Sequence, residues 1–306
     1  DRSKLDTTTY LAPAQELYKL LIAPIEGKLQ ERRINNLIFI PDAGLRALPL
    51  AALHDGKGFI VERYSVSLMP SFSLSNPRYH NLKNSTVLAM GASTFKNQAP
   101  LPAVPIELST IASQLWSGNI SINEAFTVNN LTTQRNSGNF EIVHLATHAE
   151  FRPGVPSNSY IQFWDERLGL DQVRNVKWND PPVQLLVLSA CRTALGDRQV
   201  ELGFAGLAIQ AGVQTALASL WYVSDQGTLA LMTEFYEQLK TAPIRAEALR
   251  RAQVAIIKGE VIVNNGELEG VGATGIPLPS QLRQSGKVDF SHPYYWSGFT
   301  LIGNPW

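Results

Sequence analysis

Short, almost wholly apolar runs separated by helix-like stretches are the dominant pattern of this chain. The runs expected to form strands span 36–41, 59–68, 86–91, 140–147, 183–189, 215–223 and 297–303. The stretches with apolar residues at helical spacing span 9–29, 105–116, 131–136, 204–211, 227–240 and 246–258. Strands that are apolar on both faces belong to a parallel sheet covered by helices on both sides. The pattern therefore predicts an α/β fold, a three-layer αβα sandwich around a mostly parallel sheet.

A change of rhythm near residue 86 predicts two parts. Residues 1–85 combine a helix-like start with two β-rich runs, which indicates a small sheet with a flanking helix. Residues 86–306 carry the regular alternation of strands and helices. We therefore expect an N-terminal lobe over 1–85 and a larger lobe over 86–306.

Composition and charge exclude several classes of protein. Lys plus Arg and Asp plus Glu are both 26 in 306 residues, whereas a dedicated nucleic-acid binder usually has a basic excess. No apolar run approaches the roughly 18 residues needed to cross a bilayer. The chain starts at Asp1, without Met, and shows no signal peptide. We therefore expect a piece of a longer cytoplasmic protein that binds neither nucleic acid nor membrane.

Two of the apolar runs end in chemically reactive side chains. One leads into His148 and the other into Cys191, the single cysteine. Reactive groups of parallel sheets lie beyond the carboxyl ends of the strands, and neighbouring strands are about 4.8 Å apart. An imidazole can take the thiol proton and later protonate a leaving amine, while nearby backbone N–H groups hold the oxyanion. A buried thiol and a structural histidine fit the same spacing, so both interpretations stay open here.

Metal and nucleotide sites are not supported by the motifs present. His144 lies four residues before His148, but the zincin motif needs a helix and a Glu where this chain has Leu145. His144 is expected to pack in the sheet or support the site from beneath. The G-x-G-x-x-G match at 270–275 is followed by Pro277 rather than by a helix. We predict neither a metal nor an organic cofactor.

Several motifs in the same order resemble the CHAT domain, a caspase-like family usually attached to tetratricopeptide repeats. They are His-Leu-Ala-Thr-His at 144–148, the stretch 186–196 around Cys191, and 218–225, with supporting matches at 45–53, 101–107, 246–253 and 292–299. The resemblance implies a cysteine endopeptidase with a His148–Cys191 dyad and a thioester acyl-enzyme. It implies an oxyanion site at the backbone N–H groups of Ala149 and Cys191, although many members have Gly at the position of Ala149.

The resemblance also indicates where the side chain that precedes the scissile bond, P1, would bind. In caspase-like folds this S1 pocket is built from the strands before and after the nucleophile, which points to Ser189, Trp221 and Asp225. A carboxylate at Asp225 would favour Arg or Lys at P1. Asp225 as the N-cap of the next helix is an equal alternative. Trp221 is either pocket wall or core, and an apolar P1 stays open.

The resemblance leaves the wider organisation open. Residues 1–85 are either an inactive companion lobe, a pseudo-protease, or a simple extension of the sheet. The expected partners are a protein or peptide substrate and a regulatory N-terminal repeat region in the full-length protein. A catalytically latent interaction module, and a transpeptidase or amidase that uses the same thiol, are the alternative functions.

Overall fold

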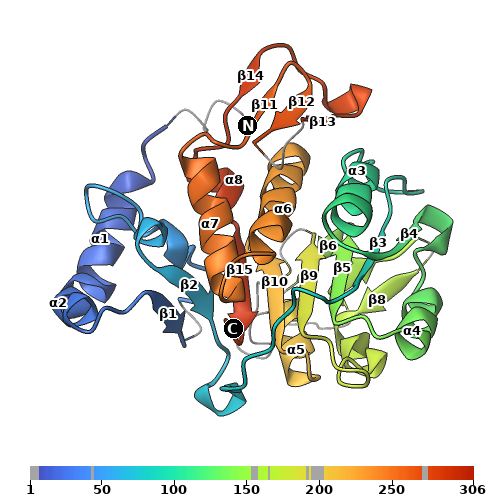
Figure 1. The fold of residues 1–306 in the computed structure, drawn as a ribbon, viewed down its shortest axis with the longest axis horizontal. Coiled ribbons are helices and arrows are strands. Elements are labelled where there is room, and N and C mark those ends of the chain that lie inside the picture. The colour runs from blue at the N-terminus through green and yellow to red at the C-terminus, as the bar shows by residue number, and fades with distance from the viewer. Residues whose placement is uncertain are drawn as a thin grey trace.

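A central sheet organises the part of the chain that the computed structural model describes, which is residues 7–42, 45–152, 158–164, 166–190, 193, 203–270 and 275–306. Eight strands within these ranges form it (Figure 1). In spatial order they are β1 (Asn36–Phe39), β2 (Ser65–Leu68), β15 (Phe299–Gly303), β10 (Thr215–Ser219), β9 (Leu185–Ser189), β5 (Ile142–Ala146), β3 (Val87–Gly91) and β4 (Gly118–Ile122).

The sheet is mostly parallel, as predicted, with one reversal. The strands β4, β3, β5, β9 and β10 run in one direction. β15 is antiparallel to β10, with Ser219 opposite Phe299, and β2 and β1 continue parallel to β15. The chain enters β15 beside the end of β10 and runs back along it. The carboxyl ends of five parallel strands therefore share one edge, which we call the carboxyl edge.

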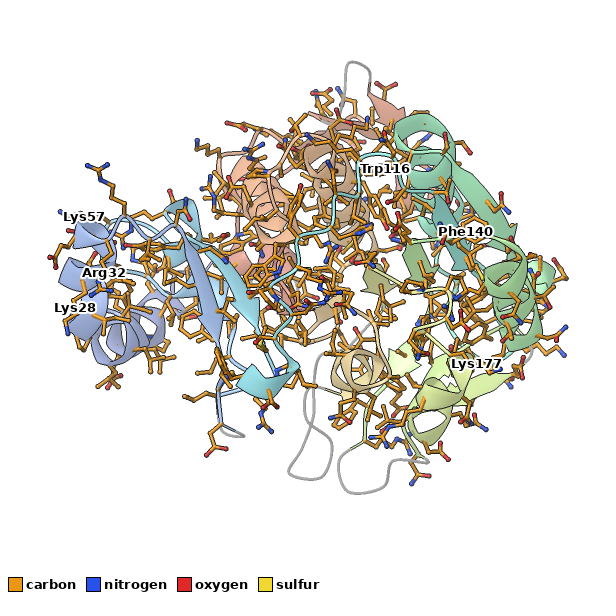
Figure 2. The ribbon with its side chains drawn as sticks, turned by 60° about the horizontal axis from the view of Figure 1, so that its bottom comes forward. Lys28, Arg32, Lys57, Trp116, Phe140 and Lys177 are labelled. Carbon is orange, nitrogen blue, oxygen red and sulfur yellow. The ribbon has the colours of Figure 1, made fainter. Side chains whose placement is uncertain are left out.

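Helices cover both faces of the sheet, which confirms the predicted three layers. α3, α6 and α7 pack on one face and α5 on the other, while exposed charges such as Lys28, Arg32 and Lys57 surround the N-terminal helices (Figures 1 and 2). The helices are α1 (Leu11–Leu21), α2 (Ala23–Glu31), α3 (Val104–Ser109), α4 (Val128–Ser137), α5 (Gly203–Gln210), α6 (Asp225–Leu239), α7 (Arg245–Ile257) and α8 (Pro293–Trp296). A π-helical turn, Thr110–Leu115, extends α3.

Two small antiparallel sheets escaped the sequence analysis because their strands are only two or three residues long. One contains β13 (Ile276–Pro277), β12 (Glu267–Glu269), β11 (Ile262–Asn264) and β14 (Lys287–Val288). The other contains β6 (Ala149–Glu150), β7 (Tyr160–Gln162) and β8 (Arg167–Gly169), and it starts directly after His148. Runs this short carry too few alternations to reveal a period.

Two expected strands are shorter in the structure, and one strand was not expected. The run 59–68 contributes only β2, after a 3-10 turn at Ile60–Glu62. The run 215–223 forms a strand only to Ser219. The next amide, that of Leu220, donates to the carbonyl of Gly298 instead of continuing beside β9. The edge strand β4 was missed because three of its five residues are exposed and no apolar run marks it.

The core lies along the inner strands of the main sheet. All residues of β3, β5, β9, β10 and β15 are buried, whereas the edge strands β1 and β4 are partly exposed. β2 lies beside β15, so the main sheet runs without a break across the boundary expected at residue 85. The division into lobes at that residue stays a prediction.

Candidate active site

The register of β5 and β9 relates the two predicted catalytic positions. The strands pair in parallel from Ile142 opposite Leu185 to Ala146 opposite Ser189, and the amide of Thr147 donates to the Ser189 carbonyl at 3.2 Å. His148 follows Ala146 by two residues, and Cys191 follows Ser189 by two. The predicted neighbouring strands are therefore neighbours with matched ends. Cys191 itself lies outside the described residues.

The described residues on both sides of Cys191 are attached to the end of β10. The hydroxyl of Ser219 donates to the carbonyl of Ala190 at 2.5 Å, and the Ser219 amide donates to the Thr193 hydroxyl at 3.0 Å. Ser219 is the last residue of β10 and is fully buried. One buried side chain and one amide thus hold both flanks of the predicted nucleophile at the carboxyl edge.

His148 is partly exposed and oriented by a backbone carbonyl. Its Nε2 lies 2.7 Å from the carbonyl oxygen of Ala99, and the ring of Phe95 lies 4.7 Å from its ring centre, tilted by 56°. A carbonyl only accepts hydrogen bonds, so Nε2 carries the proton in the neutral imidazole. Nδ1 is then the basic nitrogen, and it can accept a proton from a thiol.

Ala149 presents its amide in a suitable way for an oxyanion. It opposes Ile161 in the β6–β7 ladder, next to the hydrogen bond from the Gln162 amide to the His148 carbonyl. Residues of an antiparallel ladder alternate between bonded and non-bonded pairs, so the Ala149 N–H points away from β7.

Ser189 and Asp225, two predicted S1 residues, lie at the same edge. Ser189 ends β9, and its buried hydroxyl has no hydrogen-bond partner among the described residues. Asp225 accepts a hydrogen bond from the Ala103 amide at 3.1 Å through Oδ2. It is the first residue of α6 and not its N-cap, because Ser224 caps that helix through the Gly227 amide. The N-cap interpretation of Asp225 was therefore wrong.

Burial raises the pKa of Asp225 from 3.8 to about 6, opposed by the Ala103 hydrogen bond and assisted by the charge of Glu107. The folded state therefore binds more protons than the unfolded state between those two values, so stability falls as pH rises through that window. We expect Asp225→Asn to remove this fall. The melting temperature of the variant minus that of the wild type should therefore be larger at pH 7 than at pH 4. Calorimetry from pH 4 to 8 tests this, with the exposed Asp171→Asn as control. Parallel curves for wild type and Asp225→Asn would contradict it.

Both ring nitrogens of His144 lie within hydrogen-bond distance of protein side chains. It is fully buried in β5, between Glu107 of α3 and Tyr236 of α6. Within the described ranges, no group of three or more His, Cys, Asp or Glu side chains could hold a metal ion. The expectation that His144 packs in the sheet is confirmed.

Comparison with known proteins gives the family. The model of the CHAT domain family matches residues 11–304. The chain belongs to that family. Tetratricopeptide repeat protein 28 from Homo sapiens and from Mus musculus are both 24% identical to it over 95% of the chain, and the chain covers 13% of each relative. This CHAT domain thus spans about an eighth of the length of the curated relatives it matches.

Two solved structures share the fold of this CHAT domain. The complex of Porphyromonas gingivalis RgpB pro- and mature domains has a TM-score of 0.54 at 10% identity, covering 95% of this chain and 71% of that one. The Arg-specific cysteine proteinase gingipain R has a TM-score of 0.53 at 10% identity, covering 99% and 69%. The likeness establishes a caspase-like α/β fold, as the sequence analysis predicted.

Trp221 follows β10 by two residues and lies beside α8. It lines an apolar groove of about 340 Å³ together with residues of α1, α8 and the segment after β1, including Tyr10, Leu17, Leu53 and Tyr294. Its indole N–H donates to the Tyr294 carbonyl at 3.2 Å. A Cβ at Gly298 would lie 3.0 Å from the indole, so glycine there leaves room for the ring. Trp221 is thus a wall, but of a groove that this CHAT domain builds with its N-terminal residues.

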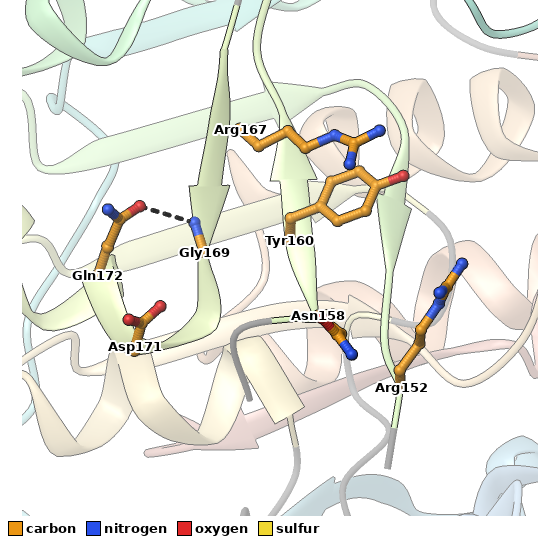
Figure 3. Close-up of a pocket in the computed structure, with 7 residues that line it drawn as sticks. All are labelled: Arg152, Asn158, Tyr160, Arg167, Gly169, Asp171 and Gln172. Atoms are coloured by element: carbon orange, nitrogen blue, oxygen red, sulfur yellow. Dashed lines mark hydrogen bonds between the residues drawn. The ribbon is translucent and has the colours of Figure 1, made fainter. Parts of the chain in front are cut away.

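A second, polar hollow of about 380 Å³ lies over β6, β7 and β8 (Figure 3). The guanidinium of Arg167 lies over the ring of Tyr160, 4.0 Å from its centre, and Arg152 pairs with Glu150 at 2.7 Å. With Asp171 also on its wall, the hollow carries both signs of charge. Its lining therefore favours no single class of ligand.

Sequence reasoning missed Ala99 and Phe95, which both contact the His148 ring. Ala99 acts through its carbonyl, a group that every residue carries, so its side chain gives no signal. Phe95 lies in a segment of weak pattern between β3 and α3. Only the folding of that segment over the end of β5 identifies either residue.

Among the described residues, no helix has the length and apolarity to cross a membrane.

Proposed function

We propose that this CHAT domain is a cysteine endopeptidase that cleaves protein or peptide substrates with a His148–Cys191 dyad. The observation that carries the proposal is the matched register of β5 and β9, with one of these residues two positions beyond each strand end. The carbonyl of Ala99 supports it, because it leaves Nδ1 of His148 as the basic nitrogen. The caspase-like fold shared with two structures of one cysteine proteinase, gingipain R or RgpB, also supports it.

The proposed reaction has two steps. In the first, the Cys191 thiol gives its proton to Nδ1 of His148, and the sulfur attacks the substrate carbonyl carbon. The oxyanion accepts hydrogen bonds from the Ala149 and Cys191 amides. The C–N bond then breaks, the imidazolium protonates the leaving amine, and a thioester remains. In the second step, His148 takes a proton from water while the water oxygen attacks the thioester carbon. The C–S bond breaks, the acid leaves, and the imidazolium returns its proton to the Cys191 sulfur.

A basic P1 residue is part of the proposal, with Asp225 as its partner. The hydrogen bond from Ala103 uses Oδ2 of Asp225, so Oδ1 is the atom proposed to meet a cationic side chain. The hydroxyl of Ser189, for which the described part of the chain offers no hydrogen-bond partner, is proposed to belong to the same pocket. One fold relative is named Arg-specific, which agrees with this preference. Trp221, which follows β10 and lines an apolar groove, is the third residue proposed for S1.

A regulatory repeat region is the proposed partner in the full-length protein. The curated relatives are named for tetratricopeptide repeats, and this domain covers only 13% of their length. Such repeats offer a large surface that can recruit a substrate or restrain the site. The cytoplasmic location stays a prediction.

The test of the proposal is digestion of a diverse peptide library read by mass spectrometry, with Cys191→Ala run beside the wild type. We expect cleavage by the wild type only, with hydrolysed rather than ligated products. Ligation would indicate a transpeptidase. The absence both of cleavage and of Cys191 acylation by electrophilic peptides would favour the interaction module.

The same library tests the P1 partner. Because a hydrogen bond to a charged group contributes about 1.5–3 kcal/mol, Asp225→Asn should lower kcat/KM after Arg or Lys by about 10- to 100-fold. Peptides cleaved after neutral residues are the internal control and should keep their rates. An equal loss at every P1 residue would exclude Asp225 as the P1 acid, and so would an apolar P1 preference in the wild type.

A further inference from the structure

Three buried polar side chains meet beneath the end of β5. His144 is on β5, Glu107 on α3 and Tyr236 on α6, and their exposed fractions are 0%, 2% and 0%. Nε2 of His144 lies 2.9 Å from Oε1 of Glu107, and its Nδ1 lies 3.2 Å from the Tyr236 hydroxyl. The proposed reaction does not use these groups, and all three are closed to substrate.

The protonation pattern of the cluster follows from its surroundings. Burial, and then the charge of Glu107, raise the pKa of Tyr236 well above its usual value, so the phenol keeps its proton. A protonated phenol can donate to Nδ1 of His144. Nε2 then carries the ring proton and donates to the Glu107 carboxylate. The result is a directed chain from Tyr236 through His144 to Glu107.

Stability is a weak explanation for three hydrogen-bonded polar side chains in the core. Buried polar or ionic groups can often be replaced by apolar side chains of similar volume without loss, and sometimes with a gain. Their hydrogen bonds are directional, however. Removing one partner leaves each of the others as an unsatisfied buried polar group, at a cost of about 1–3 kcal/mol each. The two contacts of His144 therefore tie α3 and α6 to β5 by directional bonds in the observed placement.

The placement of α3 reaches His148 through one short segment. Glu107 is one turn into α3, and its amide donates to the Ala103 carbonyl at 2.9 Å. The Ala103 amide is bonded in turn to Asp225 of α6. Four residues earlier, the Ala99 carbonyl accepts from Nε2 of His148 at 2.7 Å. His144 and His148 are themselves four residues apart on β5 and the turn after it. These contacts form a closed loop. It runs from His144 through Glu107 and Ala99 to His148, and back to His144 along the backbone.

We infer that Glu107, His144 and Tyr236 are positioning residues that hold the Ala99 carbonyl against the His148 imidazole. If α3 shifts on β5, the carbonyl moves and Nε2 loses its acceptor. The two neutral tautomers of the His148 imidazole then interconvert. Nδ1 is no longer always the basic nitrogen, and the imidazole is no longer held in one orientation. This inference rests on the proposed role of His148, but it concerns the form and orientation of the ring before any substrate binds.

The test compares Glu107→Leu, Glu107→Gln and Tyr236→Phe with the control Gln253→Met. Gln253 is an equally buried polar residue whose side-chain amide donates to the carbonyls of Trp296 and Phe299. None of these three residues belongs to the loop of contacts between His144 and His148. The first readout is the ¹⁵N chemical shifts of His148 in histidine-labelled protein, assigned with His148→Gln. We expect the Nε2–H form in wild type, Glu107→Gln and Gln253→Met, and a mixture of both forms in Glu107→Leu. Tyr236→Phe, which removes only a hydroxyl, should lie between them.

The second readout is turnover per folded molecule. Because a misplacement of about 1 Å can cost 10²-fold, Glu107→Leu should lower kcat by about 10- to 100-fold while KM changes by less than about 3-fold. Glu107→Gln should restore most of kcat, since its amide oxygen still accepts from His144. Wild-type His148 shifts in Glu107→Leu and Tyr236→Phe, or a kcat loss in Gln253→Met equal to theirs, would overturn the inference. The ¹⁵N readout needs no substrate, so a failure of the peptidase proposal would be seen separately.

Discussion

Replacing Cys191 with alanine should reduce peptide cleavage by about 10⁴-fold or more, to the background rate. The proposed reaction forms its thioester on this sulfur, and no neighbouring hydroxyl replaces it. Ser189 is buried at the end of β9, and the Thr193 hydroxyl is occupied by the Ser219 amide. The measurement is initial rate on the best peptide from the library, at enzyme concentrations that reveal slow turnover.

Covalent labelling gives this prediction a second readout. The chain contains one cysteine, so an electrophilic peptide that modifies a thiol reports on Cys191 alone. Intact mass should show one adduct on the wild type and none on Cys191→Ala. Cleavage by Cys191→Ala at the wild-type rate would mean that another nucleophile, or a contaminant, is responsible.

Replacing His148 with alanine should lower the rate of Cys191 acylation and of turnover by about 10²- to 10⁴-fold, the range of a positioned general base. The thiolate would then form only as far as the unassisted thiol ionises. The limb of the pH–rate profile that reports the imidazole should disappear, and the rate should rise with pH toward the ordinary thiol range. The measurement is single-turnover acylation from pH 5 to 9.

His80→Gln is the matched control for His148→Ala. His80 also bonds through Nε2, at 2.7 Å to Glu141, but Glu141 precedes β5 and so lies at the opposite edge of the sheet. Its replacement should leave acylation unchanged. Equal losses in the two variants would indicate a general effect of histidine removal, and an unchanged pH profile in His148→Ala would remove this residue from the dyad.

The strands that carry the site were predictable because they are buried on both faces. Such strands are nearly continuous apolar runs, and β3, β5 and β9 were each predicted within two residues of their bounds. A His and a Cys that follow such runs are conspicuous, because a polar reactive group breaks an apolar pattern. The same signal gives a wrong strand end at 215–223, where the apolar run continues although the strand ends at Ser219. Apolarity reports burial, and Leu220 is buried outside the sheet.

The surroundings of His148 were not predictable in the same way. The sequence alone marks Asp225 as an acid before a helix, which fits an N-cap as well as a pocket. Its actual partner, the Ala103 amide, is 122 residues away. Ala99 acts through a backbone group common to all residues, and Trp221 faces α1, an element from the far end of the chain. These contacts depend on long-range packing, which local pattern does not encode.

The sequence by itself determined the family of this protein, its three-layer α/β architecture and the identity of its two candidate catalytic side chains. The architecture follows from the period and burial of apolar runs, and the two side chains from the chemistry of the residues that end those runs. The family follows from the motifs that resemble the CHAT domain. Only the tertiary structure decided strand order, the β5–β9 register and the carbonyl that orients His148. It also decided the buried chain of Tyr236, His144 and Glu107. These depend on which distant segments pack together, because hydrogen-bond geometry between elements is set by their placement and not by their composition.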